Sequence, residues 1–188
     1  TTFLVSPYLI RNYKVFDEIV LTKSLGYNLL KGNYKEFKVE GNPEIIERDF
    51  KIENLGIKTD KHFEINLDNF YKDEAIKYIK SDPVNFLMNY PKKVFTFLFL
   101  NLNSSYPGYY NITHIVPKIL ISFLSFIGLV LLINKKRGFL QFLALYYISN
   151  ILFFSIFFIL PRYSLIILPI QILLSISCIK FFLRKIFN

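Results

Sequence analysis

The second half of this 188-residue chain lacks acidic residues. All 14 Asp and Glu residues lie between Asp17 and Asp82, and none follows at positions 83–188. A soluble globular domain carries charged residues of both signs over its whole surface. The missing carboxylates, together with 53% hydrophobic residues and 21 Phe, exclude a single soluble domain and a disordered chain.

Cysteine and histidine are nearly absent as well. Cys178 is the only cysteine, so the chain cannot form an internal disulfide and is not a disulfide scaffold. His62 and His114 are far apart, and neither the His-Glu-x-x-His pattern nor the glycine spacing of a phosphate loop occurs. The sequence therefore predicts no metal site and no cofactor.

What the C-terminal half does contain is three apolar runs, at residues 115–133, 139–160 and 163–179. A helix needs about 20 mostly apolar residues to cross about 30 Å of hydrocarbon, and helices satisfy their own backbone groups there. The runs predict three transmembrane helices within residues 115–188, the third slightly short and extended by the snorkelling side chain of Lys180. The alternative is a set of buried helices in a soluble protein.

Basic residues in the short loops predict the topology. A Lys-Lys-Arg cluster at 135–137 separates the first two runs, and a basic tail at 180–185 follows the third. The positive-inside rule places both in the cytoplasm, and the turn with Arg162 outside. We expect a multi-pass protein of the bacterial inner membrane whose C-terminus is cytoplasmic. Because topology explains the positive charge, the predicted partner is the lipid bilayer and not a nucleic acid.

The N-terminal half is predicted to be helical and to lie mostly outside the membrane. Residues 1–10 are apolar and too short to span, and we expect them to be the end of an upstream membrane helix that leaves the bilayer at Arg11. Residues 11–114 then form an extracytoplasmic helical region. With the three spans, this predicts an all-α, multi-pass membrane fold.

Local signals place helices within this region. Asn42 followed by Pro43 predicts a helix that begins at Pro43 and ends near Gly56. Asp82 followed by Pro83 predicts another helix, with Asp82 as its N-cap. An apolar stripe predicts a charged helix over 61–80. Residues 16–30 suit a loop or short strands. Residues 84–102 suit an amphipathic interfacial helix, kinked at Pro91.

Two arginines at membrane boundaries are candidate ligand contacts. Arg162 lies between two apolar runs beside Tyr163, where a planar guanidinium could bind a lipid-linked phosphate. Its alternative is an ordinary snorkelling interface residue. Arg11 has a similar position, and its alternative is a solvated flanking residue. Gln141 and Asn150, inside the second run, are more typical of helix–helix contacts than of ligand binding.

Several stretches resemble a known family. Residues 7–16 resemble the Pro-x-x-x-Arg-Asn-Tyr-x-x-Phe stretch of bacterial membrane glycosyltransferases. These belong to the C-type superfamily, the group of dolichyl-phosphate-mannose protein mannosyltransferases and lipid A aminoarabinose transferases. Residues 26–33 are similar to its Gly-x-Asn-x-x-x-Gly-Asn element, and residues 74–86 to its Glu-Ala-Ile-x-Tyr-Ile-x-x-x-Pro-x-x-Phe pattern. Arg162 and Tyr163, followed by Pro169, resemble its Arg-Tyr pair near the start of a late span.

The resemblance implies an inverting transfer of a sugar from a polyprenyl-phosphate donor to an extracytoplasmic acceptor. It implies that Arg162, Arg11 and Tyr163 bind the donor phosphate. The general base of such enzymes is an acidic residue in the first extracytoplasmic loop, upstream of this stretch, so we assign no catalytic residue. Asp17 or Glu18 is the alternative base.

The chain starts with Thr1, and Met88 is its only methionine, so we expect it to be the C-terminal part of a longer chain, with the missing N-terminal part as a partner. On its own, it is then expected to transfer no sugar. The alternatives are a non-catalytic membrane protein of envelope polysaccharide handling, such as a flippase or ligase-like protein, and an accessory subunit.

Overall fold

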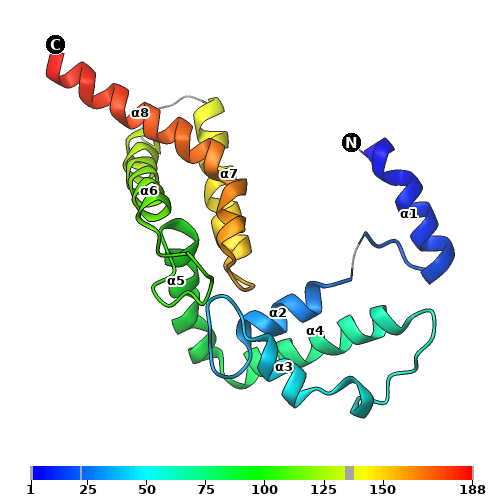
Figure 1. Ribbon diagram of the computed structural model, residues 1–188. Helices are drawn as coiled ribbons and strands as arrows, with labels where there is room; N and C mark the ends of the chain where they lie inside the picture. The colour runs from blue at the N-terminus through cyan, green and yellow to red at the C-terminus, as the bar shows by residue number, and fades with distance from the viewer. Residues whose placement is uncertain (1, 22, 134–137, 188) are drawn as a thin grey trace. The chain divides into compact units, whose positions relative to one another are not determined.

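The regular structure of the chain is entirely helical in the computed structural model, which describes residues 2–21, 23–133 and 138–187 (Figure 1). No strand occurs in these ranges, so the expected all-α class is confirmed. The chain forms two compact units, Thr1–Phe86 and Leu87–Asn188, which are described in turn.

The first unit contains α1 (Thr2–Phe16), α2 (Leu25–Asn33), α3 (Pro43–Asp49), the 3₁₀-helix η1 (Ile52–Asn54) and α4 (Phe63–Ser81). α4 confirms the helix predicted over 61–80, whereas the one predicted from Pro43 to Gly56 ends early, at Asp49. α1 continues past Arg11, where we expected a membrane helix to end. It stops at Asp17, which has a φ of 56° and donates its N–H to the Tyr13 carbonyl at 2.8 Å.

The prediction of a loop or short strands over 16–30 is wrong for residues 25–30, which belong to α2. One face of α2 is buried: Leu30 is fully buried in a cluster with Ile46, Tyr71 and Ala75. Packing of this face outweighs the weak helix propensity of the Gly-Tyr-Asn sequence that opens the helix.

A glycine lets α2 lie directly against α4, as Figure 1 shows. A Cβ atom added to Gly26 would overlap the backbone carbonyl oxygen of Asp68. The buried Asp68 carboxylate also accepts a hydrogen bond from the Tyr27 N–H at 3.0 Å. The first glycine of the 26–33 element therefore has a packing role, since any larger residue would separate the two helices.

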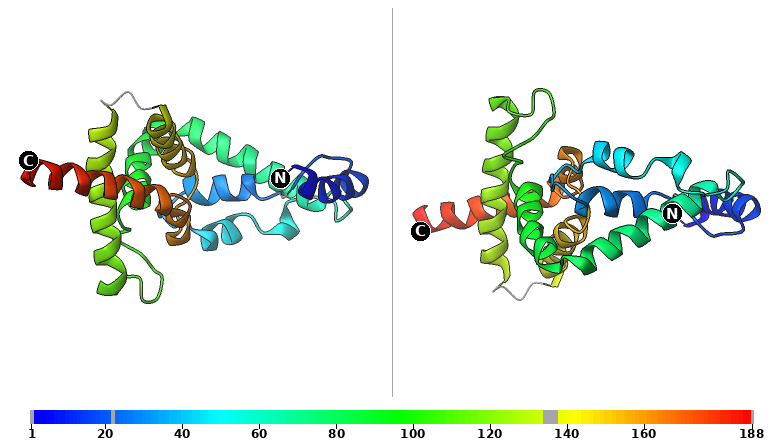
Figure 2. Two further views of the ribbon diagram at one scale, coloured as in Figure 1. Left: turned by 90° about the horizontal axis from the view of Figure 1, so that it is seen from above. Right: turned by 90° about the horizontal axis from the view of Figure 1, so that it is seen from below.

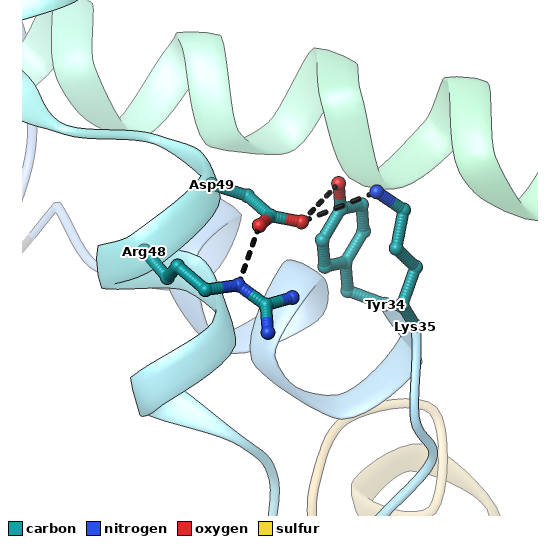
Figure 3. Close-up of polar contacts among 4 residues, drawn as sticks. All are labelled: Tyr34, Lys35, Arg48 and Asp49. Atoms are coloured by element: carbon teal, nitrogen blue, oxygen red, sulfur yellow. Dashed lines mark hydrogen bonds and ion pairs between the residues drawn. The ribbon is translucent and has the colours of Figure 1, made fainter.

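A carboxylate joins the ends of α2 and α3 (Figure 3). Asp49 accepts hydrogen bonds from Arg48 Nε at 2.9 Å, Lys35 Nζ at 3.2 Å and the Tyr34 hydroxyl at 3.2 Å. The hydrogen bonds from Arg48 and Lys35 lower the pKa of the Asp49 carboxyl. Asp49 is thus a structural anchor for the segment that follows α2.

The second unit begins within α5 (Pro83–Leu98) and contains α6 (Ile112–Ile133), α7 (Gly138–Phe154), the 3₁₀-helix η2 (Pro161–Ile166) and α8 (Leu168–Phe187). The predicted cap of α5 is confirmed, because the Asp82 carboxylate accepts the Asn85 N–H at 3.0 Å. Pro91 lies inside α5, which ends at Leu98 and not near 102.

Among the described residues, one stretch, Ile112–Leu132 of α6, is helical, long and apolar enough to cross a membrane. The helix of the second predicted span stops at Phe154 because the chain turns there, with Ile156 N–H bonded to the Phe153 carbonyl at 3.2 Å. The third begins only at Leu168, and its last turns carry basic residues. Three spans are therefore not confirmed. The Lys-Lys-Arg cluster at 135–137 lies outside the described residues.

The second unit has polar groups inside and apolar groups outside. Gln171 Nε2 donates to Ser122 Oγ at 3.4 Å and to the Tyr147 hydroxyl at 3.3 Å, and all three residues are buried. These contacts connect α6, α7 and α8. The outward faces of the same helices expose large apolar side chains, including Phe123, Phe126, Phe142, Leu145 and Leu173.

The side chains expected to join helices do not do so. Gln141 is exposed, and Asn150 Nδ2 donates to the Tyr146 carbonyl of its own helix at 2.8 Å. The interhelical amide is Gln171 instead. Only one face of α7 packs against α6. Because the sequence of α7 is apolar all around the helix, its pattern does not show which residues lie on that face.

Gly128 is expected to be essential for the crossing of α6 and α8, which Figure 2 shows. Its Cα lies so close to Leu174 that an added Cβ would overlap the Leu174 carbonyl oxygen. Gly128→Ala should therefore destabilise the second unit by about 1–3 kcal/mol, the usual cost of overpacking. The measurement is thermal unfolding in detergent. Gly138→Ala is the control, because a Cβ at Gly138 meets no atom within 4 Å; equal midpoints for the two variants would contradict the role of Gly128.

Asp49→Asn is expected to destabilise the first unit in a pH-dependent way. Because the folded-state pKa of Asp49 is lowered, its charge stabilises the fold above the unfolded pKa, near 3.8. That contribution is lost as the pH falls through the folded pKa. The unfolding midpoint of Asp49→Asn should be lower than that of the unmodified protein at pH 7, and the difference should shrink below pH 3.8 and vanish only below the lowered folded-state pKa. Asp73→Asn, at an exposed site on α4, is the control that should show no such difference.

Candidate functional site

Arg11 is held at the surface of the first unit by its neighbour. Its Nη1 donates to Asn12 Oδ1 at 3.2 Å. Asn12 is buried, only 3% exposed, and its Nδ2 donates to the Val20 carbonyl at 2.8 Å and to the Leu21 carbonyl at 3.5 Å. One amide therefore fixes the loop after α1 and orients the guanidinium.

A pocket of about 410 Å³ lies between the last turns of α1, this loop and the first turn of α4. Its walls mix aromatic, aliphatic, amide and charged side chains: Tyr8, Arg11, Asn12, Phe16, Val20, Leu21, Lys23, Glu64 and Ile65. This volume suits a small ligand, within the usual 300–1,000 Å³ of ligand sites.

The charges on the pocket wall are of both signs. Arg11 is exposed and carries a fork of donors that matches the oxygens of a phosphate. Lys23 is a second cation, whose Nζ pairs with Glu18 Oε2 at 3.1 Å. Glu64, in the first turn of α4, is the carboxylate among the wall residues. The arrangement suits a ligand with an anionic group and neutral polar groups nearby.

The two alternative bases lie in ion pairs and are not among the wall residues. Asp17 Oδ2 is 2.8 Å from Lys61 Nζ, and the hydrogen bond from Lys61 lowers the pKa of Asp17. Glu18 pairs with Lys23. A general base must reach the proton that it removes, and a lowered pKa makes a carboxylate a weaker base. Asp17 and Glu18 are each paired with a lysine, and neither lines the pocket.

Arg162 and Tyr163 lie together on η2 in the second unit. Arg162 is exposed. The Tyr163 ring packs against Phe154 and Phe158, with centroid distances of 5.6 and 5.8 Å, and its N–H donates to the Leu160 carbonyl at 3.0 Å. Tyr163 thus anchors the turn that presents Arg162.

Two side chains of α5 support the chain where α7 ends. The Tyr90 hydroxyl donates to the Leu152 carbonyl at 2.7 Å, and Lys93 Nζ donates to the Ile156 carbonyl at 3.4 Å. Lys93 is 1% exposed, and this burial lowers its pKa to about 7. The last carbonyls of a helix have no partner within the helix, so these donors stabilise the break before η2.

Metal binding has no support in the part of the chain that the structure describes. No group of three or more His, Cys, Asp and Glu side chains could hold an ion there, and Cys178 is buried.

The structure places the predicted site residues in two separate units. Arg11 belongs to the first unit, and Arg162 and Tyr163 belong to the second. The sequence did not predict Lys23 and Glu64 as site residues. The pocket combines residues 8–23 with Glu64 and Ile65, more than 40 positions later, and no sequence motif links the two segments. Comparison of the chain with protein-family models, with curated proteins and with solved structures gives no match.

Proposed function

We propose that this chain is part of a membrane glycosyltransferase that moves a sugar from a polyprenyl-phosphate donor to an extracytoplasmic acceptor. The observation that carries the proposal is the pocket beside Arg11, because this arginine belongs to the stretch that resembles such enzymes. The pocket offers a guanidinium for the donor phosphate and space for the sugar that the phosphate carries.

The orientation of Arg11 supports this role. A guanidinium binds phosphate best when two of its N–H groups meet two oxygens, which requires a fixed plane. The hydrogen bond to Asn12, itself buried and bonded to the loop, restrains the side chain. A solvated flanking arginine, the alternative for this position, would not need a buried partner.

The second unit supplies the membrane part of the proposal. We place α6 and the segments at residues 139–160 and 163–179 across the bilayer. Their exposed apolar faces suit contact with lipid, and their buried Ser, Gln and Tyr groups suit helix association within it. The proposed orientation keeps the Arg162 turn outside and the C-terminus in the cytoplasm of a bacterial inner membrane.

Arg162 is proposed as a phosphate contact of the second unit, considered separately from the pocket beside Arg11. It is exposed on a turn that Tyr163, Lys93 and Tyr90 hold in place, and no carboxylate occurs after Asp82 to compete for it along this part of the sequence. A cation at the outer surface would meet the phosphate of a lipid whose tail lies in the bilayer.

Arg11→Ala in the natural protein, reconstituted in nanodiscs, is expected to weaken binding of a polyprenyl-phosphate sugar about ten- to a hundredfold. This corresponds to one charge-assisted contact of about 1.5–3 kcal/mol. Arg11→Lys should restore only part of the affinity, because an ammonium keeps the charge and loses the fork. Arg162→Ala should have a similar effect.

The control for this experiment is Lys14→Ala, which removes a cation from the last turn of the same helix, outside the pocket wall. Unchanged donor affinity in Arg11→Ala would contradict the proposed phosphate contact. Tight donor binding without transfer to any acceptor would favour the flippase- or ligase-like alternative.

Cysteine labelling in intact cells is expected to confirm the proposed topology. In a Cys178→Ser background, a cysteine at Ser105 should react with an impermeant maleimide, and one at Gly138 should not. Ser105 and Gly138 are both exposed in the structure, so accessibility within the fold does not explain a difference. The reverse labelling pattern would show that the orientation is wrong.

A further inference from the structure

We infer that Glu64 makes the pocket select a neutral sugar next to the phosphate and reject a sugar that carries a carboxylate. The inference rests on the proposed function, since it assumes that the phosphate of a sugar phosphate binds beside Arg11. It assigns to Glu64 a role as a specificity-determining residue.

The position of Glu64 is the first argument. It lies in the first turn of α4 and lines the same pocket as Arg11, Asn12 and Lys23. A pocket of about 410 Å³ is within the usual size of a small-ligand site, and Arg11 and Glu64 both line it, so a phosphate on Arg11 would place its sugar in the pocket that Glu64 lines.

The charge distribution is the second argument. Lys23 shares its charge with Glu18, whereas Glu64 is exposed on the pocket wall. An ionised carboxylate only accepts hydrogen bonds, so it suits the hydroxyl groups of a sugar. A carboxylate on the ligand sugar would bring a like charge into the pocket that Glu64 lines, and like charges repel.

The helix that carries Glu64 is firmly positioned. Gly26 and Asp68 fix α4 against α2, and Ile65, next to Glu64, is 3% exposed. Packing therefore holds the backbone of this turn in place, while the Glu64 side chain itself is exposed. A change of Glu64 to an isosteric amide should alter recognition without unfolding the unit.

The test uses glucose 1-phosphate, glucuronic acid 1-phosphate and inorganic phosphate as soluble probes, with the natural protein in nanodiscs and calorimetric binding. The unmodified protein should bind glucose 1-phosphate about tenfold more tightly than glucuronic acid 1-phosphate. Glu64→Gln should reduce this ratio to near one, because glucuronic acid 1-phosphate should then bind more tightly. Arg11→Ala should weaken all three probes.

The matched control is Glu74→Gln, on the same helix, where the carboxylate pairs with Lys77 at 3.2 Å and is not among the pocket residues. It should keep the tenfold ratio. The inference is overturned if the unmodified protein binds both sugar phosphates equally or binds neither, or if Glu64→Gln keeps the full ratio. Failure of the proposed function would instead show as absent transfer from a lipid-linked donor while this selectivity persists.

Discussion

The candidate site depends on one buried amide. Asn12 is the residue whose side chain bonds both to Arg11 and to the backbone of the loop that follows α1. Without its donor, the Val20 carbonyl would lose a partner and the loop would lose its attachment to α1. The pocket wall is made of that helix, that loop and the start of α4, so its shape follows from this contact and from the Asp17–Lys61 ion pair nearby.

In the second unit, the corresponding constraint is the end of α7, where a helix stops among apolar side chains. Where α7 stops, Tyr90 of α5 donates to the Leu152 carbonyl in its last turn and Lys93 donates to the Ile156 carbonyl just beyond it, while Phe97 stacks on Phe154 at 5.8 Å. Backbone that departs from a helix within an apolar environment is stable only when protein groups satisfy it. The turn that presents Arg162 follows a break whose backbone carbonyls accept hydrogen bonds from Tyr90 and Lys93.

The sequence predicted what depends on local signals and missed what depends on packing. Asp82 followed by Pro83 starts a helix, and the charged helix over 61–80 has the stripe that predicted it. α2 was missed because its stability comes from burying Leu30 against residues about 40 positions later. Glu64 was missed for the same reason, since an acidic residue in the first turn of a helix has an ordinary local role there.

The uneven distribution of carboxylates now has a physical interpretation. A carboxylate buried among the apolar side chains of the second unit would need a partner, and the second unit instead uses neutral amides and hydroxyls in its contacts between helices. Cations tolerate membrane boundaries because their long stems reach the surface, which carboxylates on shorter side chains do less well. The proposed discrimination between neutral and acidic sugars is therefore assigned to the first unit, where Glu64 is exposed to water.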